Sequence, residues 1–389
     1  MVQATVLNGH RPKPHDAYDP STAPRRRLLV LTSKPKGISP GQRFRLEQWA
    51  PHAEARHGIE MDFVPFESPR LTEILYHQGR KPEKAFWVLR DFARRAADVV
   101  RARRYDGVVV FREAALIGPA VYERLFAWTQ TPMFFDFDDA IWMPTQVSAA
   151  NGIFTKLHFF GKTSTICKLS SAVLAGNEYL ATYARARNSN VYVLPTSIEL
   201  EKYPVIPEPE QDDPLIVSWS GSVHTLRNFE EARPALERVA KQRRLVVKVI
   251  CNKPPARPIE GAENVFIPWR EEGEAEAIGA AHIGIMPLPD DDYHRGKCGL
   301  KALQFMATGR PVILSPVGMN SDLIQSGKNG FLARTTDEWV DALERLGSSR
   351  ELRARLGAAG RKTVEEGYSA GVVSDRFGRA VQETLARRG

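Results

Sequence analysis

Short apolar runs alternate with amphipathic segments along most of the chain. Such runs predict parallel strands, because a strand covered on both faces loses the polar alternation of a half-exposed strand. The first half of the chain has runs at residues 28–31, 60–66, 107–111, 133–137, 172–175 and 191–194, and the second half has them at 215–219, 245–250, 265–267, 283–286 and 312–314. Helical patterns separate these runs. The alternation predicts an α/β fold with parallel sheets.

The predicted elements form two groups joined by a proline-rich segment. Residues 201–214 contain four prolines and predict a linker between a first domain at 25–200 and a second domain at 215–372. Residues 1–24 are polar and contain prolines, so we expect a disordered tail rather than a signal peptide. Residues 373–389 predict a terminal helix.

The composition fits a soluble protein in a reducing compartment. The chain has 389 residues and 43% hydrophobic content, which is enough for two cores. Its three cysteines have no short spacing, so they indicate neither a disulfide framework nor a structural zinc site. A reducing cytoplasm therefore fits best. No apolar run approaches the length of a membrane-spanning helix.

The charge balance narrows the range of partners. A formal net charge of +8 favours polyanionic partners such as nucleotide diphosphates, anionic lipid surfaces or nucleic acid. Nucleic acid is the weakest of the three, because the sequence has neither zinc-finger spacing nor the aromatic pattern of an RNA-binding sheet. Motifs of the type G-x-G-x-x-G, G-x-x-x-x-G-K-[ST] and G-x-S-x-G do not occur in a suitable context, so dehydrogenase, kinase and esterase functions lose their usual support.

The segment 295–318 combines glycines, lysines, a helical pattern and a short apolar run. A helix that begins near Gly299 would point unpaired N–H groups and the positive end of its dipole at an anion. Lys297, Lys301 and Gln304 share a helical stripe that can meet a phosphate and then a ribose, apart from the stripe that faces the core. This pattern indicates a phosphate site. The same residues could also form a solvated helix face and an ordinary turn.

Charged residues follow two predicted strands, at the edge where open α/β sheets place their ligands. Arg112 and Glu113 follow the run 107–111, and Asp136, Asp138 and Asp139 lie at or after the end of 133–137. Carboxylates gathered at a strand end are costly unless they bind something or accept N–H bonds. The Asp-x-Asp pattern allows a metal site, and the alternatives are activation of a hydroxyl or the capping of the next segment.

The helical pattern at 81–104 is strongly basic. Its apolar stripe consists of Phe86, Leu89, Ala93, Ala96 and Val100. Arg90, Arg94 and Arg101 recur on another face, which could rest on anionic lipid headgroups. The alternative is a helix that only covers a sheet.

The segment 295–318 resembles the donor-binding motif of the nucleotide-sugar glycosyltransferases of family 4, which have two Rossmann-like domains in the GT-B arrangement, with parallel sheets facing a central cleft. The resemblance continues at 317–320, 329–333 and 368–369, and upstream at 176–178 and 194–195. In that family two glutamates contact the sugar and the ribose. Gly296 and Gln304 stand at those positions here. Gln304 can still bond ribose hydroxyls, whereas Gly296 has no side chain for the sugar.

The resemblance implies a glycosyltransferase that moves a sugar from a nucleotide-diphosphate sugar to a hydroxyl of a glycan or lipid-linked acceptor, with retention and without a metal or other cofactor. The implied donor contacts are Gly221, Ser222, His224, Arg227, Lys297, Cys298, Gly299, Leu300, Lys301 and Gln304. The implied catalytic residues are Asp138, Asp139 and Arg112, and the implied acceptor contacts are Arg43, Arg45 and Glu113. The terminal helix is expected to pack back on the first domain.

The resemblance also allows the inner face of the plasma membrane as a site of peripheral attachment. Two alternatives remain open. One is a protein that binds a nucleotide sugar without transferring it, and the other is a basic adaptor on a membrane surface.

Overall fold

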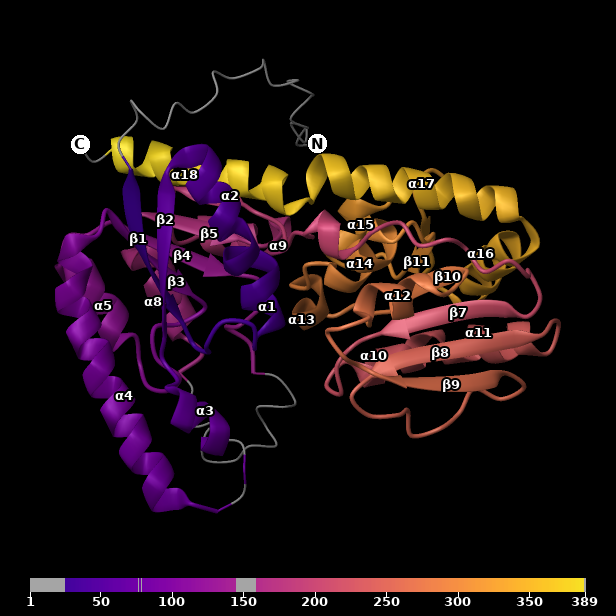
Figure 1. The fold of residues 1–389 in the computed structure, drawn as a ribbon, viewed down its shortest axis with the longest axis horizontal. Coiled ribbons are helices and arrows are strands. Elements are labelled where there is room, and N and C mark those ends of the chain that lie inside the picture. The colour runs from indigo at the N-terminus through magenta and orange to yellow at the C-terminus, as the bar shows by residue number, and fades with distance from the viewer. Residues whose placement is uncertain (1–24, 76, 78, 145–158, 388–389) are drawn as a thin grey trace.

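The structure is a computed structural model that describes residues 25–75, 77, 79–144 and 159–387. The predicted tail at 1–24 lies outside the described residues. Two parallel six-stranded sheets are present, one in each half of the chain (Figure 1). Their strand orders are β2-β1-β3-β4-β5-β6 and β12-β11-β10-β7-β8-β9. The predicted α/β class with parallel sheets is therefore confirmed.

The N-terminal sheet is built from the apolar runs of the first half of the chain. Its strands are β1 (Arg26–Thr32), β2 (Ile59–Pro65), β3 (Gly107–Phe111), β4 (Met133–Phe137), β5 (Ala172–Ala175) and β6 (Val191–Val193). Successive residues of β1 face opposite sides of the sheet: Leu29 and Leu31 join one buried cluster, and Leu28 and Val30 join another. Burial on both faces explains the apolar runs within these strands, as in β3, whose five residues are all buried and apolar or glycine.

Helices and one π-helical segment cover the N-terminal sheet. They are α1 (Pro40–Gln42), the π segment (Arg43–Glu47), α2 (Gln48–His57), α3 (Pro69–Leu75), α4 (Lys81–Arg101), α5 (Val121–Trp128), α8 (Lys162–Leu169) and α9 (Glu178–Arg185). The π segment lies between α1 and α2 and interrupts an otherwise continuous helical stretch from Pro40 to His57. Such insertions re-aim side chains and often occur at functional sites.

The C-terminal sheet follows the linker. Its strands are β7 (Leu215–Ser220), β8 (Leu245–Cys251), β9 (Glu263–Pro268), β10 (Ile283–Met286), β11 (Val312–Leu314) and β12 (Phe331–Leu332). Its helices are α10 (Leu226–Phe229), α11 (Arg233–Ala240), α12 (Glu274–Gly279), α13 (Asp292–Arg295), α14 (Leu300–Ala307), α15 (Met319–Leu323), α16 (Thr336–Ser348) and α17 (Arg350–Gly367). A separate buried cluster fills the space between β7, β8, α11 and α16.

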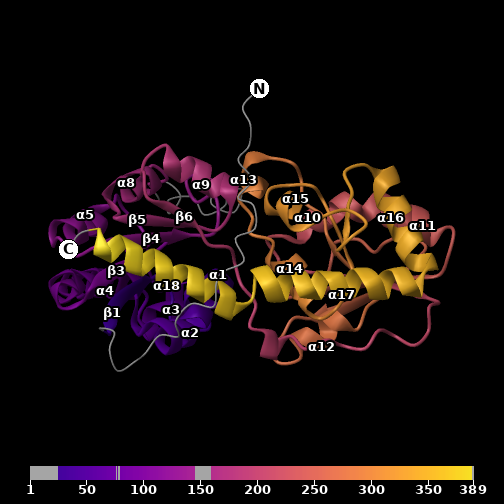
Figure 2. The same cartoon turned by 90° about the horizontal axis from the view of Figure 1, so that it is seen from above.

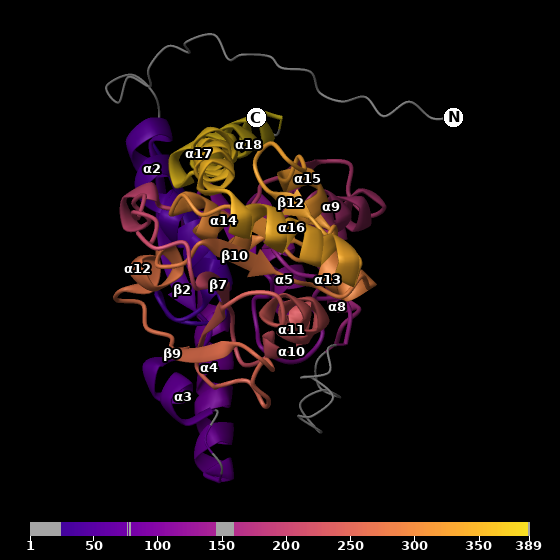
Figure 3. The same ribbon diagram turned by 90° about the vertical axis from the view of Figure 1, so that its right-hand side faces the viewer.

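The last helix, α18 (Ala370–Ala386), returns to the N-terminal domain (Figure 2). The rings of Trp49 and Phe377 lie 5.6 Å apart, and the Ser374 hydroxyl donates to the Trp49 carbonyl at 3.0 Å. The chain therefore crosses between the domains twice, once through the linker and once between α17 and α18. Figure 1 shows α17 and α18 following one another along one edge of the molecule, and Figure 3 looks along both helices, which lie at the top of that view. Within the described residues, no helix has both the length and the apolar character needed to cross a bilayer.

Candidate active site

The N-terminus of α14 carries the predicted anion site. Gly299 precedes the helix in a left-handed conformation, with φ of 65° and ψ of 14°, which strains any other residue. No side chain caps this end. The first helical bond runs from the Leu303 N–H to the Gly299 carbonyl at 3.0 Å. The N–H groups of Leu300, Lys301 and Ala302 therefore have no partner within the helix, and the helix dipole adds to their attraction for an anion.

Lys297 extends from the turn before α14 toward the N-terminal domain. Its Nζ donates to Asp139 Oδ2 at 2.9 Å and to the Tyr293 hydroxyl at 3.0 Å. Burial alone would lower the pKa of Lys297, but Asp139 and Tyr293 together raise it. The ammonium group is therefore charged at neutral pH and lies between the α14 turn and the end of β4.

The carboxylates after β4 each face a different cation. Asp138 accepts from Arg112 Nε at 2.7 Å, and Asp139 accepts from Lys297. Burial alone would raise the pKa of Asp138, but Arg112, Arg45 and Lys297 together lower it, so this group is ionised at neutral pH. The backbone of Arg112 has a φ of 62°, an uncommon conformation for a residue with a side chain.

The two domains touch directly beside this site. A Cβ added to Gly296 would lie 2.9 Å from both the Cβ and the N of Ala140, and one added to Gly176 would lie 2.5 Å from Cys298 Sγ. The Cys298 thiol donates to the Asp138 carbonyl at 3.2 Å, and burial raises the pKa of this thiol. The glycines permit a backbone approach that larger residues would block.

Asn177 ties the two domains together from the N-terminus of α9. Its Oδ1 accepts from the Leu180 N–H at 2.9 Å and so caps α9. Its Nδ2 donates to the carbonyls of Arg295 and Lys297, at 3.1 and 3.0 Å. One amide therefore positions the phosphate turn against the end of the N-terminal sheet. The sequence offered no signal for this second role.

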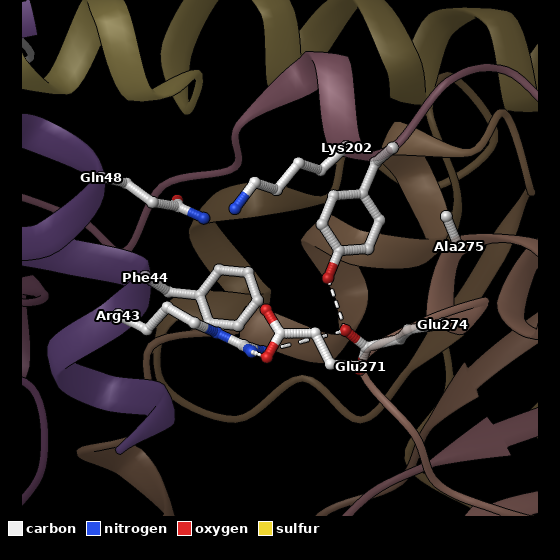
Figure 4. Close-up of a pocket in the computed structure, with 8 residues that line it drawn as sticks. Arg43, Phe44, Gln48, Lys202, Glu271, Glu274 and Ala275 are labelled. Carbon is white, nitrogen blue, oxygen red and sulfur yellow. Dashed lines mark hydrogen bonds and ion pairs between the residues drawn. The ribbon is translucent and has the colours of Figure 1, made fainter. Parts of the chain in front are cut away.

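A small pocket lies on the other side of α14, between the π segment and α12 (Figure 4). It encloses about 50 Å³ and is lined by Arg43, Phe44, Gln48, Lys202, Tyr203, Glu271, Glu274 and Ala275. Arg43 Nη1 lies 2.6 Å from Glu271 Oε2, so this predicted acceptor contact spans the domain interface. The space has room for one or two water molecules, since a water occupies about 30 Å³ of the liquid.

Gln304 and Lys301 belong to this pocket side rather than to the Lys297 side. Gln304 is fully buried, and its Nε2 donates to the Tyr203 hydroxyl at 2.6 Å while its Oε1 has no partner. Lys301 donates to Glu274 Oε1 at 3.2 Å, and burial lowers its pKa although Glu274 opposes that shift. The prediction of one polar stripe shared by Lys297, Lys301 and Gln304 is therefore wrong. The phosphate turn unwinds before Gly299 and sends Lys297 to the opposite side.

Tyr203 and Glu274 complete this side of the site, and the sequence pattern indicated neither of them. The Tyr203 hydroxyl donates to Glu274 Oε2 at 2.6 Å. Burial alone would raise the pKa of Glu274, but Lys301 and the hydrogen bonds from Tyr203 and Trp269 lower it. Tyr203 lies in the linker and Glu274 begins α12, far apart in sequence, so no local pattern could connect them.

The loop after β7 holds the other predicted donor contacts. Ser222 and His224 are exposed, and Ser222 N–H bonds Thr225 Oγ1 at 2.9 Å. Asn228 Oδ1 lies 3.2 Å from His294 Nε2, which connects this loop to α13 just before the phosphate turn. The Gly221 backbone lies against the Trp219 ring, 2.3 Å from the position of an added Cβ. The predicted position of Arg227 near the donor remains a prediction.

Two predicted acceptor contacts form buried ion pairs within the N-terminal domain. Arg45 is 0% exposed, donates to Asp136 Oδ2 at 2.9 Å and to the Leu194 carbonyl at 2.6 Å, and so lies in the core of the N-terminal domain. Glu113 forms an ion pair with Lys162 of α8, and burial raises the pKa of this carboxyl although Lys162 opposes the shift. The prediction that Arg45 contacts the acceptor is therefore wrong, because its side chain is buried and paired with Asp136. The sequence could not show this, since a charged residue that pairs in the core has the same local pattern as one that faces a ligand.

One cluster of potential metal ligands lies elsewhere among the described residues. Oxygen or nitrogen atoms of Glu208, Asp212 and His282 lie within 4.8 Å of one another. Arg353 forms ion pairs with both carboxylates, and His282 Nδ1 accepts from the Ile216 N–H at 2.9 Å. The arrangement is an arginine-centred ion-pair cluster that fixes the linker to the C-terminal domain.

Comparison with known proteins places this site in a family context. Residues 215–349, which include the phosphate turn, match the family described as Glycosyl transferases group 1. D-inositol 3-phosphate glycosyltransferase of Nocardioides sp. (strain ATCC BAA-499 / JS614) is 32% identical over 93 residues. That match covers 23% of this chain and 19% of the relative.

Solved structures share the whole two-domain architecture. Sucrose-phosphate synthase of Thermosynechococcus elongatus is 16% identical with a TM-score of 0.64, over 94% of this chain and 100% of that chain. A glycosyltransferase of Rickettsia africae ESF-5 is 13% identical with a TM-score of 0.64, over 93% and 99% of the two chains. HepE of Anabaena, in complex with UDP and glucose, is 12% identical with a TM-score of 0.61, over 92% and 100%. At such low identity these similarities establish the fold. The chain therefore has the GT-B fold and carries, at residues 215–349, a domain of the glycosyl transferases group 1 family.

Proposed function

We propose that the protein transfers a sugar from a nucleotide-diphosphate sugar to an acceptor hydroxyl, with the diphosphate bound at the N-terminus of α14. One observation carries this proposal. Inside the matched domain, an uncapped helix N-terminus and the charged Lys297 face the ionised Asp138 and the neighbouring Asp139 across the domain interface. The HepE structure in complex with UDP and glucose supports a nucleotide ligand for this fold.

The main catalytic task in this proposal is to stabilise the departing diphosphate. Negative charge grows on the diphosphate as the glycosidic bond breaks, so donors aimed at it lower the barrier. The N–H groups of Leu300 and Lys301 and the ammonium of Lys297 would supply this stabilisation. Because these groups are positively polarised or charged, the proposed reaction needs no metal. We also propose that the reaction retains anomeric configuration, as in the enzymes that this motif resembles.

Asp139 connects the donor side to the acceptor side. In the structure its carboxylate is paired with Lys297. A diphosphate that binds Lys297 would compete with Asp139 for the ammonium group and leave the carboxylate available to an acceptor hydroxyl. Asp138, which Arg112 holds ionised, would position the same hydroxyl. The acceptor is a glycan or a lipid-linked sugar in glycoconjugate or polysaccharide synthesis.

The nucleoside requires a rearrangement of the pocket beside Gln304. A cavity of about 50 Å³ is too small for a nucleoside, since small-molecule sites enclose about 300–1,000 Å³. The Tyr203 hydroxyl also occupies the Gln304 amide that would bond the ribose. Tyr203 lies in the linker, so a change in the relative position of the domains would withdraw it. The structure thus represents a state that precedes donor binding.

A second candidate function is nucleotide-sugar binding without transfer. Gly296 replaces the glutamate that contacts the sugar in the family of resemblance, and a Cβ at this position would already lie 2.9 Å from Ala140. In this domain arrangement no larger side chain fits there. The site would then lack one sugar contact, which favours a binding protein over an enzyme.

A nucleotide titration tests the phosphate assignment. A thermal-shift screen of UDP-, GDP-, CMP- and dTDP-sugars first identifies the nucleoside, because a ligand that binds only the folded state raises the midpoint. The matching nucleoside diphosphate and monophosphate are then titrated by calorimetry into wild type, Lys297→Met and the control Lys328→Met. We expect Lys297→Met to weaken diphosphate binding about tenfold, close to 1.4 kcal/mol, and monophosphate binding much less.

The control variant removes an exposed lysine of the same domain and should leave both affinities unchanged. A diphosphate affinity that does not depend on Lys297 would contradict the assignment of the site. Release of nucleoside diphosphate from the identified donor then distinguishes the two functions, since a binding protein releases none with any acceptor.

A further inference from the structure

Helix α4 has apolar side chains on two sides: Trp87, Val88, Phe92 and Val99 pack partly buried against the domain, next to buried charged residues, and a second apolar stripe faces solvent. Phe86, Leu89 and Val100 are 62%, 70% and 72% exposed, and Ala93 and Ala96 on the same stripe are also exposed. The fully buried residues of α4 are Asp91, Arg95 and Asp98. An amphipathic helix that only covers a sheet would have polar or charged residues at the exposed positions of Phe86, Leu89 and Val100.

The buried charges have a structural reason. Arg95 donates to the carbonyls of Ala114, Thr32 and Val64 at 2.9, 3.3 and 3.2 Å, and so satisfies acceptors near the ends of β1 and β2. Asp91 accepts from the Ser68 N–H at 2.8 Å, at the start of α3. Unpaired buried backbone groups are costly, so these bonds determine which side of α4 faces the domain. The apolar stripe is left outside as a consequence.

The charge around this stripe has one sign. The chain from Arg80 to Arg104 has nine lysines and arginines against three acidic residues. Two of those acids, Asp91 and Asp98, are buried. Glu83, the third, lies 2.6 Å from an Arg70 nitrogen. The exposed side of the helix therefore combines large apolar side chains with basic residues and has no unpaired carboxylate among the described residues.

The neighbouring helix α5 continues this character. Val121, Arg124 and Trp128 recur at i, i+3 and i+7 and are all exposed, with Trp128 at 78%. Tyr122, between them, packs on α4 through a hydrogen bond to the Phe92 carbonyl at 2.5 Å. Figures 1 and 2 place both helices at the outer edge of the N-terminal domain, away from the C-terminal sheet.

We propose that the exposed side of α4, with Phe86, Leu89 and Val100 at its centre, binds the interface of an anionic lipid bilayer. Apolar side chains enter the boundary between headgroups and acyl chains, and basic side chains attract the anionic headgroups. A 21-residue helix is about 32 Å long and can lie flat on such a surface. A second copy of this chain fits less well, because pairing of two such faces would bring their basic residues together without acidic partners.

Co-sedimentation with vesicles tests this proposal on the full-length protein, without any need for a donor or turnover. Vesicles of phosphatidylcholine alone are compared with vesicles that contain one-third phosphatidylglycerol. We expect wild type to partition at least tenfold more strongly to the anionic vesicles, with loss of binding as salt is raised from 0.05 to 0.5 M, since surface charges are screened. The triple variant Phe86→Ser, Leu89→Ser, Val100→Ser should lose at least tenfold of this partitioning.

Two matched comparisons separate the apolar and electrostatic contributions. Arg103→Glu with Arg104→Glu should weaken anionic binding at least fivefold, whereas Lys241→Glu with Lys328→Glu makes the same change of charge on the C-terminal domain and should weaken it much less. Phe266→Ser controls for the loss of one exposed aromatic residue. Circular dichroism melts verify that each variant is folded.

Three results would overturn the proposal. The first is no binding of wild type to either vesicle. The second is equal binding by wild type and the triple serine variant. The third is a concentration-dependent dimer, measured by analytical ultracentrifugation, that the triple serine variant abolishes, because the stripe would then bind a second copy. None of these results depends on whether the protein transfers a sugar.

Discussion

The ion pair between Arg45 and Asp136 allows a quantitative test of whether Arg45 belongs to the core of the N-terminal domain or contacts an acceptor. Both side chains are 0% exposed, and Arg45 also donates to the Leu194 carbonyl. Replacing Arg45 by Met leaves a buried carboxylate without its cation, which costs about 3–5 kcal/mol of unfolding free energy. The double variant Arg45→Met, Asp136→Leu removes both charges, so only the unpaired Leu194 carbonyl remains, at about 1–3 kcal/mol.

Urea unfolding followed by tryptophan fluorescence measures both values. A decrease of about 4 kcal/mol lowers the midpoint by about 2 M when the slope is about 2 kcal/mol per molar. Arg238→Met is the control, because the Arg238–Asp337 pair is 50% and 81% exposed and should contribute less than about 1 kcal/mol. If Arg45→Met changed acceptor affinity at unchanged stability, our placement of Arg45 in the core would be refuted.

The same variant has a defined dependence on pH. Burial raises the pKa of Asp136 above its ordinary value, although Arg45 opposes the shift. The folded state then holds more protons than the unfolded state at pH values above about 4, so stability from this group falls as pH rises. Without Arg45 only the charge of Arg112 still opposes this pKa shift, so the fall of stability with pH becomes steeper. The stability difference between wild type and Arg45→Met should therefore shrink as the pH approaches 4, and a difference that grows on acidification would contradict this account.

Two further substitutions test the catalytic side and the pocket. The methyl group added in Gly41→Ala would lie 2.4 Å from Asp138 Oδ2 and 3.0 Å from Arg112 Nη2, so we expect it to displace the carboxylate. The rate of diphosphate release should then fall at least tenfold, while donor affinity stays within twofold of wild type. An unchanged rate would exclude a catalytic role for the Asp138–Arg112 pair. Tyr203→Phe removes the hydroxyl that holds the Gln304 amide and should tighten nucleoside-diphosphate binding three- to tenfold in calorimetry, whereas weaker binding would show that Tyr203 contributes to the site.

The strands were predictable because their signal is local. A strand buried on both faces is apolar at most positions, so the runs at 107–111, 133–137, 172–175 and 283–286 coincide with the observed strands. Gly299 was equally predictable, since its left-handed backbone and the helix after it follow from residue type. The side of α4 that faces solvent was not predictable. Periodicity identifies an apolar stripe, but it cannot show that carbonyls of distant segments need the donors on the opposite side.

The partners of the charged residues could not be predicted from the sequence either, because these contacts join segments that are far apart along the chain. Arg43 and Arg45 are two positions apart, yet one spans the domain interface and the other lies in the core. Both residues lie in the π segment, where the spacing of side chains around the helix axis differs from that of an α-helix. Asn177 gave a correct local signal as a helix cap, and its contact with the phosphate turn follows only from how the two domains meet.

The glycine at position 296 has a different meaning in the structure than in the sequence. Beside the family pattern it means that the side chain for one sugar contact is absent. In the structure the glycine is a steric requirement, because a Cβ at position 296 would lie 2.9 Å from Ala140 of the other domain. Gly176 has the same role on the N-terminal side, where an added Cβ would lie 2.5 Å from Cys298 Sγ. Two glycines on opposite domains serve the same interface, so the close approach depends on both positions rather than on one substitution.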